Sequence, residues 1–140
     1  MVHFQETFEV ATGGRGMFEV TAQVCACVAA SRVHTGLCVV FCRHTSCSLA
    51  IGENADPSVQ ADLLAWLERI CPDGDPRTTH VAEGPDDMPA HLRATITRTS
   101  ENIPIVAGSL ALGTWQGIYL LEHRNQAHRR RLIVHVSGDE

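Results

Sequence analysis

Hydrophobic and polar residues alternate near both ends of the chain, as they do in β-strands that bury one face. The first such segment is "VHFQETFEV", Val2 to Val10, and a glycine-rich turn, "TGGRG", follows it at Thr12 to Gly16. Three further strand-like runs occupy the last third of the chain, namely "IPIVAG", "SLALGTWQGIYLLEH" and "RLIVHVSG". Glycines or polar turns separate these runs, which is typical of connected strands. The pattern therefore predicts β-structure at both ends of the sequence.

A helix is predicted shortly after the glycine-rich turn. Val20, Val24 and Val28 recur every fourth residue, which places them on one side of a helix. Thr21 is a candidate N-cap, because a threonine hydroxyl can accept a hydrogen bond from a free amide of the first turn. A short β-branched run, "LCVVFC", follows at Leu37 to Cys42 and is typical of a buried strand.

The clearest helix follows a second strand in the middle of the chain. The run "RHTSCSLAI" begins with a bend at Arg43 and His44 and continues as that strand. After "ENADP" a helix is predicted, because Asp56 can cap its amides and Pro57 suits its first turn. Pro72 ends this helix, and its apolar stripe consists of Val59, Leu63, Trp66, Leu67 and Ile70.

A long segment without a hydrophobic period, "CPDGDPRTTHVAEGPDDMPA", extends from Cys71 to Ala90. Loops of this length inside a compact domain are usually functional or disordered. A short helix is predicted to begin near Pro89, with Asp87 as a candidate N-cap. Strands at both ends and helices between them predict a single α+β domain over residues 1–140. We expect a mostly antiparallel, β-sandwich-like sheet with two to three helices.

The composition of the chain narrows the classes of function. The formal charge is −5 over 140 residues, which argues against nucleic acid as a partner, because such binding places Lys and Arg opposite phosphates. The one basic run, "HRRR" from His128 to Arg131, is interpreted as a solvated shoulder of a hairpin. No apolar run approaches the roughly 18 to 20 residues that span a bilayer, and the sequence does not begin like a signal segment. We therefore expect a cytoplasmic protein with no membrane partner.

The six cysteines raise the question of disulfide bonds. Their spacings include no C-x-x-C pair of the zinc-ribbon kind. In a reducing cytosol their ordinary role is that of small buried hydrophobes, and this is the role predicted for them. Cys47 lies close to His44 in the sequence, which makes a nucleophilic thiol one interpretation, but it falls where a buried strand begins. A packed thiol is therefore the preferred interpretation.

Eight histidines in so short a chain suggest a metal site, because neutral imidazole is the commonest ligand for zinc and similar ions. Most of them fall in strands or turns, where a surface or core role suffices. His44, His80 and His91 differ, since they lie at a bend, in the long loop and at the head of a helix. Their spacing alone does not bring them together. Three unrelated imidazoles with ordinary hydrogen bonds therefore remain the alternative to a shared cluster.

Carboxylates occur near the same segments, at Glu53, Asp56, Asp86, Asp87 and Glu122. Helix capping is a sufficient reason for Asp56 and explains Asp87 equally well. Glu53 and Glu122 have no such reason, so they are the better candidates for a general base, a ligand or a group that orients a histidine. A pair of carboxylates is equally suited to hold Mg²⁺ on a phosphate. No P-loop and no G-x-G-x-x-G motif is present, which argues against P-loop enzymes and Rossmann dehydrogenases.

Several long motifs in order resemble one protein family. These are "GGRGMFEVT", "RHTSCSLAIGENADP", "EGPDDMPAHL", "LALGTWQGIYLLEHR" and "RRRLIVHVSG". They are similar to the YjbQ family of small bacterial and archaeal proteins, some of which carry the label secondary thiamine-phosphate synthase. The likeness covers essentially the whole chain. It implies a compact α+β, sandwich-like fold assembled as a homotrimer, with a polar site built around the family's histidines.

The resemblance also implies roles for particular residues. The family's histidines correspond to His44, His80 and His91, which we expect to bind a divalent metal of the zinc type, or Mg²⁺ with a phosphorylated substrate. The acids with implied catalytic or bracing roles are Glu53, Asp56 and Glu122. The residues expected to contact the substrate are Arg15, Thr45, Asn54, Trp115, Gln116 and Arg124. Many relatives have threonine-alanine-glycine where this chain has "SCS", so no role for the central cysteine is implied.

Two functions are compatible with these residues, beside the alternative of a structural trimer with a vestigial site. The first is a metal-dependent enzyme that acts on a small phosphorylated substrate, with weak thiamine-phosphate synthase activity as one expectation. The second is a non-catalytic trimer that binds a metal or a metabolite as a sensor. The same side chains serve as ligands in both cases, so the sequence alone does not separate them.

Overall fold

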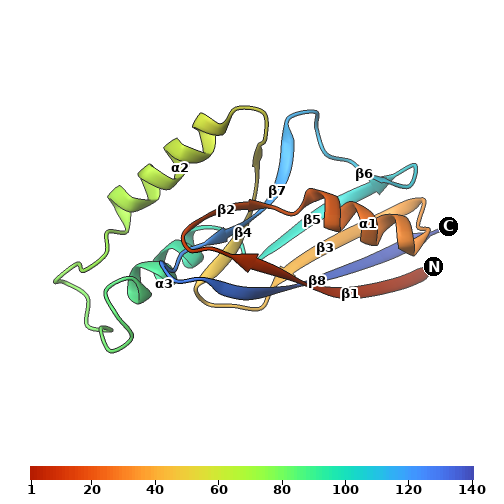
Figure 1. Ribbon diagram of the computed structural model, residues 1–140. Helices are drawn as coiled ribbons and strands as arrows, with labels where there is room; N and C mark the ends of the chain where they lie inside the picture. Colours follow the sequence, from red (N-terminus) through yellow and green to blue (C-terminus); the bar gives the residue numbers. More distant parts are fainter.

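Two antiparallel sheets form the framework of the protein in the computed structural model, which describes all residues 1–140 (Figure 1). The larger sheet has the order β1 (Val2–Thr12), β8 (His128–Asp139), β3 (Thr35–Cys42), β5 (Ser100–Val106) and β6 (Ser109–Leu110). The smaller sheet has the order β2 (Gly16–Glu19), β7 (Gln116–Glu122) and β4 (Cys47–Glu53). Three helices complete the domain, namely α1 (Thr21–Ser31), α2 (Pro57–Ile70) and α3 (Asp87–Ile96). The predicted α+β class and antiparallel sheets are confirmed.

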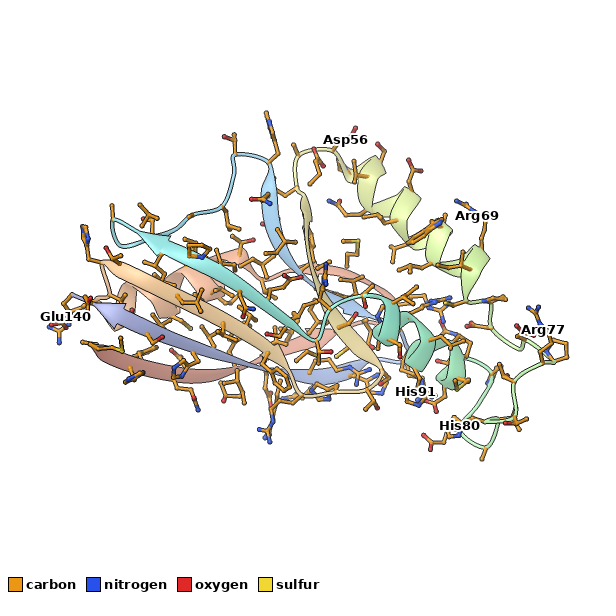
Figure 2. The ribbon with its side chains drawn as sticks, turned by 180° about the vertical axis from the view of Figure 1, so that it is seen from behind. Asp56, Arg69, Arg77, His80, His91 and Glu140 are labelled. Carbon is orange, nitrogen blue, oxygen red and sulfur yellow. The ribbon has the colours of Figure 1, made fainter.

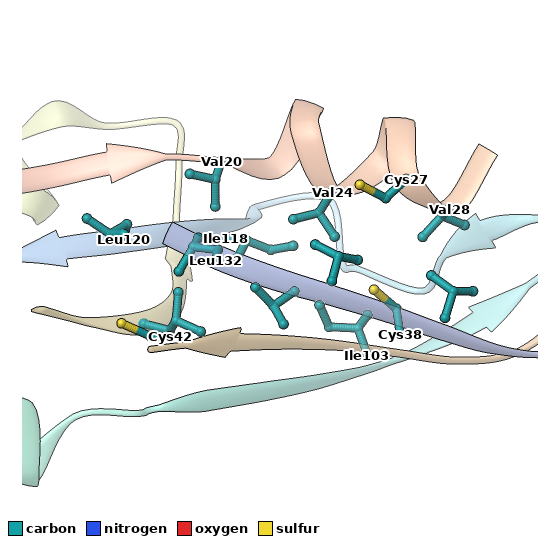
Figure 3. Packing of buried hydrophobic residues seen from close by; sticks show 14 of the residues in the cluster. Val20, Val24, Cys27, Val28, Cys38, Cys42, Ile103, Ile118, Leu120 and Leu132 are labelled. Atoms are coloured by element: carbon teal, nitrogen blue, oxygen red, sulfur yellow. The ribbon is translucent and has the colours of Figure 1, made fainter. Parts of the chain in front are cut away.

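The main core lies between α1 and the two sheets (Figure 3). The three valines of the predicted helical face, Val20, Val24 and Val28, are at most 2% exposed. The prediction that Thr21 caps this helix is wrong. Thr21 is the first helical residue, and its hydroxyl accepts a hydrogen bond from the amide of Ile118 on β7 at 2.9 Å. A partner on a neighbouring strand has replaced the local cap.

Helix α2 begins as predicted but is largely uncovered. The Asp56 carboxylate accepts a hydrogen bond from the amide of Ser58 at 2.9 Å, which confirms it as the N-cap. Figure 1 shows α2 standing away from the sheets. Of its apolar stripe only Leu67 is buried, whereas Trp66 and Ile70 remain 47% and 46% exposed. The stripe is present, but no segment of the same chain covers most of it.

Helix α3 begins two residues earlier than expected, and its first residue does not cap it. The preceding residue is Asp86, and no side-chain capping bond is formed. The prediction of Asp87 as a cap is therefore wrong, because its carboxylate contacts the side chains of His80, His91 and Arg124 instead of a free backbone amide. The long loop before α3 is tied to the β1–β2 turn by an ion pair of 2.9 Å between Arg15 and Asp73.

The glycine-rich turn packs closely against the β7–β8 connection. Gly14 has φ +120°, and a Cβ atom there would lie 2.7 Å from the carbonyl oxygen of Asn125. Both the left-handed backbone and the close approach require glycine. The turn therefore brings Arg15 next to the end of β7, where its guanidinium donates to the carbonyl oxygen of His123.

The cysteines are free thiols. Five are buried, as predicted, but Cys25 is exposed on the outer side of α1, so the prediction is wrong for that residue. Cys47 is 1% exposed, as expected of a packed thiol, and its sulfur lies 3.3 Å from that of Cys42. None of the three helices has the length and apolar character that a membrane crossing requires.

Candidate metal centre

Two histidines and one carboxylate meet where the long loop joins α3. Asp87 and His91 are one turn apart on α3, so their side chains share a face of the helix. His80 reaches them from the loop, and its Nε2 lies 2.8 Å from Asp87 Oδ2. The Nε2 atom of His91 lies 3.1 Å from the same oxygen. The ligand atoms of all three residues lie within 4.8 Å of one another, and Figure 2 shows both histidines at one end of the molecule.

Arg124 fixes the orientation of the shared carboxylate. Its guanidinium donates to Asp87 Oδ1 at 2.7 Å and to Asp86 Oδ2 at 3.1 Å. Asp87 is 2% exposed. Burial alone raises the pKa of its carboxyl, but a hydrogen bond from His80 and the nearby positive charges outweigh burial and hold the pKa below its usual value. The carboxylate is therefore ionised at neutral pH, with one oxygen on Arg124 and the other facing the histidines.

The backbone fixes which nitrogen of His91 carries the proton. His91 Nδ1 lies 2.9 Å from the carbonyl oxygen of Thr45, and a carbonyl can only accept a hydrogen bond. Nδ1 must therefore be protonated, which leaves a lone pair on Nε2 when the ring is neutral. That lone pair lies opposite the ionised oxygen of Asp87. The two acceptors repel each other unless a proton or a cation lies between them, so the geometry suits a bound cation.

His44 lies near this group but is held differently. Its Nε2 accepts a hydrogen bond from the backbone amide of Arg131 at 2.8 Å. Burial and the positive charge of Arg130 lower the pKa of His44, so its ring is neutral at pH 7 with the proton on Nδ1. Within one chain, the group that can hold a metal therefore contains Asp87 beside His80 and His91, while His44 lines an adjacent depression with His91.

Glu122, at the end of β7, and Arg130, on β8, form a buried ion pair. Glu122 is fully buried and accepts hydrogen bonds from Nε and a terminal nitrogen of Arg130, and from the hydroxyl of Thr12 at 2.7 Å. Arg130 is 4% exposed, so the interpretation of the "HRRR" run as a solvated shoulder is wrong for this residue. Arg130 also donates to the carbonyl oxygen of Ser46. The pair thereby holds the bend that contains His44.

His123 is a buried neutral imidazole. It is 1% exposed, and its Nε2 lies 2.8 Å from the hydroxyl of Ser48. Burial and the nearby arginines lower its pKa from 6.5 to about 3. Glu122 binds Arg130, His123 contacts Ser48, and Arg124 binds the two aspartates. Each residue of the "EHR" sequence at the end of β7 therefore has a hydrogen-bond partner within the protein.

We predict that His123 makes the protein less stable in mild acid. Between pH 7 and pH 5 the unfolded state binds a proton at this histidine, whereas the folded state does not. The free energy of unfolding should therefore fall by about 2 kcal/mol over this range. Urea unfolding at the two pH values measures the loss. His123→Gln should lose much less, and an exposed control, His34→Gln, should behave like the wild type. Equal losses in all three proteins would contradict the assignment.

The structure separates the site residues expected from the sequence into two groups. Glu53 pairs with Gln116 at one end of β4, and Cys47 pairs with Glu122 at the other. A strand of this length separates its ends by about 20 Å. The group at or near the candidate metal centre contains His44, Thr45, His80, His91 and Arg124, with Arg15 and Glu122 further inside the domain. The distant group contains Glu53, Asn54, Asp56, Trp115 and Gln116, and Figure 2 shows Asp56 far from His80 and His91.

Sequence reasoning missed Asp87 as a member of the centre. Local rules assign it to helix capping, although "DMPAH" places an acid and a histidine four residues apart, which puts both on one face of a helix. That spacing was the available signal. Thr45 contributes its backbone carbonyl oxygen to His91, a role that no side-chain pattern reveals.

The chain is an α+β protein with a candidate centre for a divalent metal. The centre consists of a carboxylate that two histidines share and an arginine holds, where the long loop joins α3. Sequence comparison then identifies the family of the chain. The family described as "UPF0047 protein YjbQ-like" matches residues 6–139, and the chain belongs to this family.

Individual relatives agree with this assignment over nearly their whole length. The UPF0047 protein sll1880 of Synechocystis sp. is 52% identical over 135 residues, which cover 96% of this chain and 92% of the relative. The UPF0047 protein YjbQ of Escherichia coli O157:H7 is 37% identical and covers 97% and 99% of the two chains. A crystal structure of a YjbQ/UPF0047 family protein from Clostridium acetobutylicum matches with a TM-score of 0.83 at 33% identity, covering 95% of this chain and 98% of that one.

A further structure shows how widely the fold is shared. A YbjQ-like protein of unknown function from Sulfolobus solfataricus P2 matches with a TM-score of 0.87. Its identity to this chain is 22%, and the match covers 98% of this chain and 99% of the other. The arrangement of sheets and helices is therefore retained where most side chains differ.

Proposed function

We propose that the protein is a divalent-metal-dependent enzyme that acts on a small phosphorylated substrate. The observation that carries this proposal is the lone pair of His91 Nε2 opposite the ionised oxygen of Asp87, an arrangement that a cation stabilises. Two imidazoles and a carboxylate are a ligand set used for catalytic zinc, which leaves a coordination position for water or a substrate oxygen. A bound ion would polarise a substrate oxygen or lower the pKa of a bound water.

The residues around the centre support pre-organised metal binding. Thr45 holds the ring of His91 through its carbonyl oxygen, and Arg124 holds Asp87. Contacts of this kind set the orientation and basicity of metal ligands. Arg124 already binds the carboxylates of Asp86 and Asp87. Its role in this proposal is therefore to orient the ligand rather than to bind substrate. Arg15 is likewise occupied by Asp73.

Metal content tests the proposed centre. The purified wild-type protein, loaded with zinc and then dialysed, should retain about one ion per chain, because three ligands converge on one point. His80→Ala and His91→Ala should each lose most of it. His34→Ala is the matched control, since this histidine is exposed in a turn at the other end of the larger sheet. Full retention of zinc in both site variants would remove these residues from the ligand set.

Turnover separates the enzyme from the non-catalytic alternative. The zinc-loaded protein would be incubated with the two precursors of thiamine phosphate, a pyrimidine pyrophosphate and a thiazole phosphate. Product that disappears in a His80→Ala/His91→Ala variant would support the synthase activity suggested by the family label. Stoichiometric zinc binding without product would favour a metal-binding sensor or another phosphorylated substrate.

We also propose that the protein assembles as a homotrimer. Two exposed apolar surfaces support self-association: the outer stripe of α2, with Trp66 and Ile70, and the open face of the larger sheet, with Leu37 and Phe41 at 40% and 44% exposure. The two groups of expected site residues lie at opposite ends of β4, so only a neighbouring subunit could bring them into one site. Light scattering should give three times the chain mass of 15.2 kDa. A mass of one chain would contradict this proposal.

A further inference from the structure

A surface depression of about 370 Å³ lies beside the metal centre. It is formed by the bend after β3, by the C-terminal half of α3 and by the segment that leads into β5. The residues that line it are His44, Thr45, His91, Ala94, Thr95 and Thr99. His91 belongs both to this depression and to the metal centre, so a ligand bound in the depression would lie next to the ion.

The polar groups of the depression are uncharged hydrogen-bond donors. The Nε2 atom of His44 accepts from the amide of Arg131, so the proton of the neutral ring is on Nδ1. This Nδ1–H has no partner within the protein and is not buried. The hydroxyls of Thr45 and Thr99 likewise form no hydrogen bond within the chain, whereas the hydroxyl of Thr95 donates to the carbonyl oxygen of His91. No carboxylate lines this surface.

Two arginines are direct sequence neighbours of these donors. Arg43 precedes His44 and Arg98 precedes Thr99, and the two segments are adjacent because the Cys42 amide donates to the carbonyl oxygen of Thr99. Both arginines are exposed. Neither forms an ion pair, in contrast to Arg15 and the arginines of β8, each of which has a carboxylate within 4.0 Å. Neither arginine lines the depression itself, and the charge of Arg98 also acts on the carboxyl of Glu101. Two exposed arginines next in sequence to uncharged donors nevertheless add positive potential, which favours an anion.

We propose that this depression binds the phosphate group of a phosphate monoester and places it against the metal centre. The proposal rests on the proposed function for the identity of the substrate, but the anion site itself requires no metal. His44 Nδ1–H and the hydroxyls of Thr45 and Thr99 donate to the phosphate oxygens, while Arg43 and Arg98 supply positive charge. The role of His44 is then that of a donor to the substrate, and the metal is held by His80, Asp87 and His91.

Binding to the metal-free protein tests the anion site directly. Protein treated with EDTA would be titrated with glycerol phosphate and, separately, with inorganic phosphate, and binding followed by calorimetry. Thr45→Val/Thr99→Val removes two donors that have no partner in the protein, and it keeps the Thr45 carbonyl that holds His91. Arg43→Gln/Arg98→Gln removes the charge. Each pair should weaken glycerol phosphate binding by about tenfold or more.

A charge-matched control distinguishes a built site from general attraction. Arg32→Gln/Arg69→Gln removes two exposed arginines elsewhere on the molecule and should leave the affinity unchanged. Equal weakening in this control, or binding of inorganic phosphate with exclusion of the monoester, would overturn the proposal. So would monoester binding that requires zinc and is the same in wild type and site variants, because the ion alone would then hold the phosphate.

Zinc content keeps the two proposals separate. The Thr45→Val/Thr99→Val variant should retain zinc at the wild-type level, since neither hydroxyl contacts the metal centre. If the wild-type protein bound the monoester but retained no zinc after loading and dialysis, the anion site would be supported and the metal-dependent function would not. Zinc binding without any phosphate affinity in the metal-free protein would overturn the anion site alone.

Discussion

Glu122→Gln is expected to lower the free energy of unfolding by about 3–5 kcal/mol, because it leaves the Arg130 guanidinium buried without an opposing charge. Glutamine has nearly the same size as glutamate, so the loss reports the charge rather than a cavity. Glu122 is fully buried and Arg130 is 4% exposed, so water cannot replace the missing carboxylate. Urea unfolding at pH 7 measures the change.

A different glutamate–arginine pair, on the surface between β1 and β8, provides the control. Glu9 pairs with Arg131 at 3.3 Å on the surface, with side-chain exposures of 43% and 61%. Glu9→Gln should therefore cost less than about 1 kcal/mol. The double variant Glu122→Leu/Arg130→Met should recover much of the stability lost by Glu122→Gln, because no charge then remains buried. Similar small losses in Glu9→Gln and Glu122→Gln would show that the buried pair is not a dominant contribution.

Loss of this pair should also loosen the backbone beside the candidate metal centre. Arg130 donates to the carbonyl oxygen and hydroxyl of Ser46, in the bend that presents His44 and Thr45. Thr45 in turn accepts from His91 Nδ1. The buried pair therefore supports the contact that sets the tautomer of a candidate metal ligand, although neither Glu122 nor Arg130 belongs to the candidate group. This explains why an acid placed at the end of a buried strand is a bracing group here.

The parts of the fold that could be predicted are those encoded by local patterns. The valine spacing of α1 and the cap and proline of α2 specify those helices without information from elsewhere in the chain. Sheet order is different, because β1 pairs with β8 across more than 100 residues. Alternation shows that a strand has one buried face but does not identify its neighbours.

Local rules fail for two short polar residues, for a physical reason. Local rules assign the hydroxyl of Thr21 and the carboxylate of Asp87 to the nearest helix N-terminus. In the folded protein each binds a group from a distant segment, Ile118 for the first and Arg124 for the second. Capping contributes only about 1 kcal/mol, so a buried partner or a charged one can replace it.

The candidate site shows the same limit. His80 and His91 could be identified by residue type and by position at a loop and a helix end. The Nε2 atom of His44, in contrast, is occupied by the amide of Arg131, and no local pattern shows that a strand from the end of the chain passes there. The tautomers of His44 and His91 are both set by backbone groups, which are present in every sequence and therefore leave no signal in it.

Asp87→Asn is expected to weaken zinc binding by about 100-fold or more, since it removes a charged ligand and places an amide between two histidines. The carboxylate is the point where Arg124, His80 and His91 meet, at 2.7, 2.8 and 3.1 Å. Asparagine keeps the size of the side chain and can still accept from Arg124, so the fold should persist. Competition with a chromophoric zinc indicator measures the affinity.

The adjacent residue supplies the matched control for this substitution. Asp86 also accepts from Arg124, at 3.1 Å, and carries the same charge one position earlier in the chain, but it does not face the histidines. Asp86→Asn should therefore change zinc affinity by less than about tenfold, an effect of a bracing contact rather than of a ligand. If both variants bound zinc as tightly as the wild type, the carboxylate would be a hydrogen-bond acceptor for the two histidines, and the cation would have to be sought elsewhere.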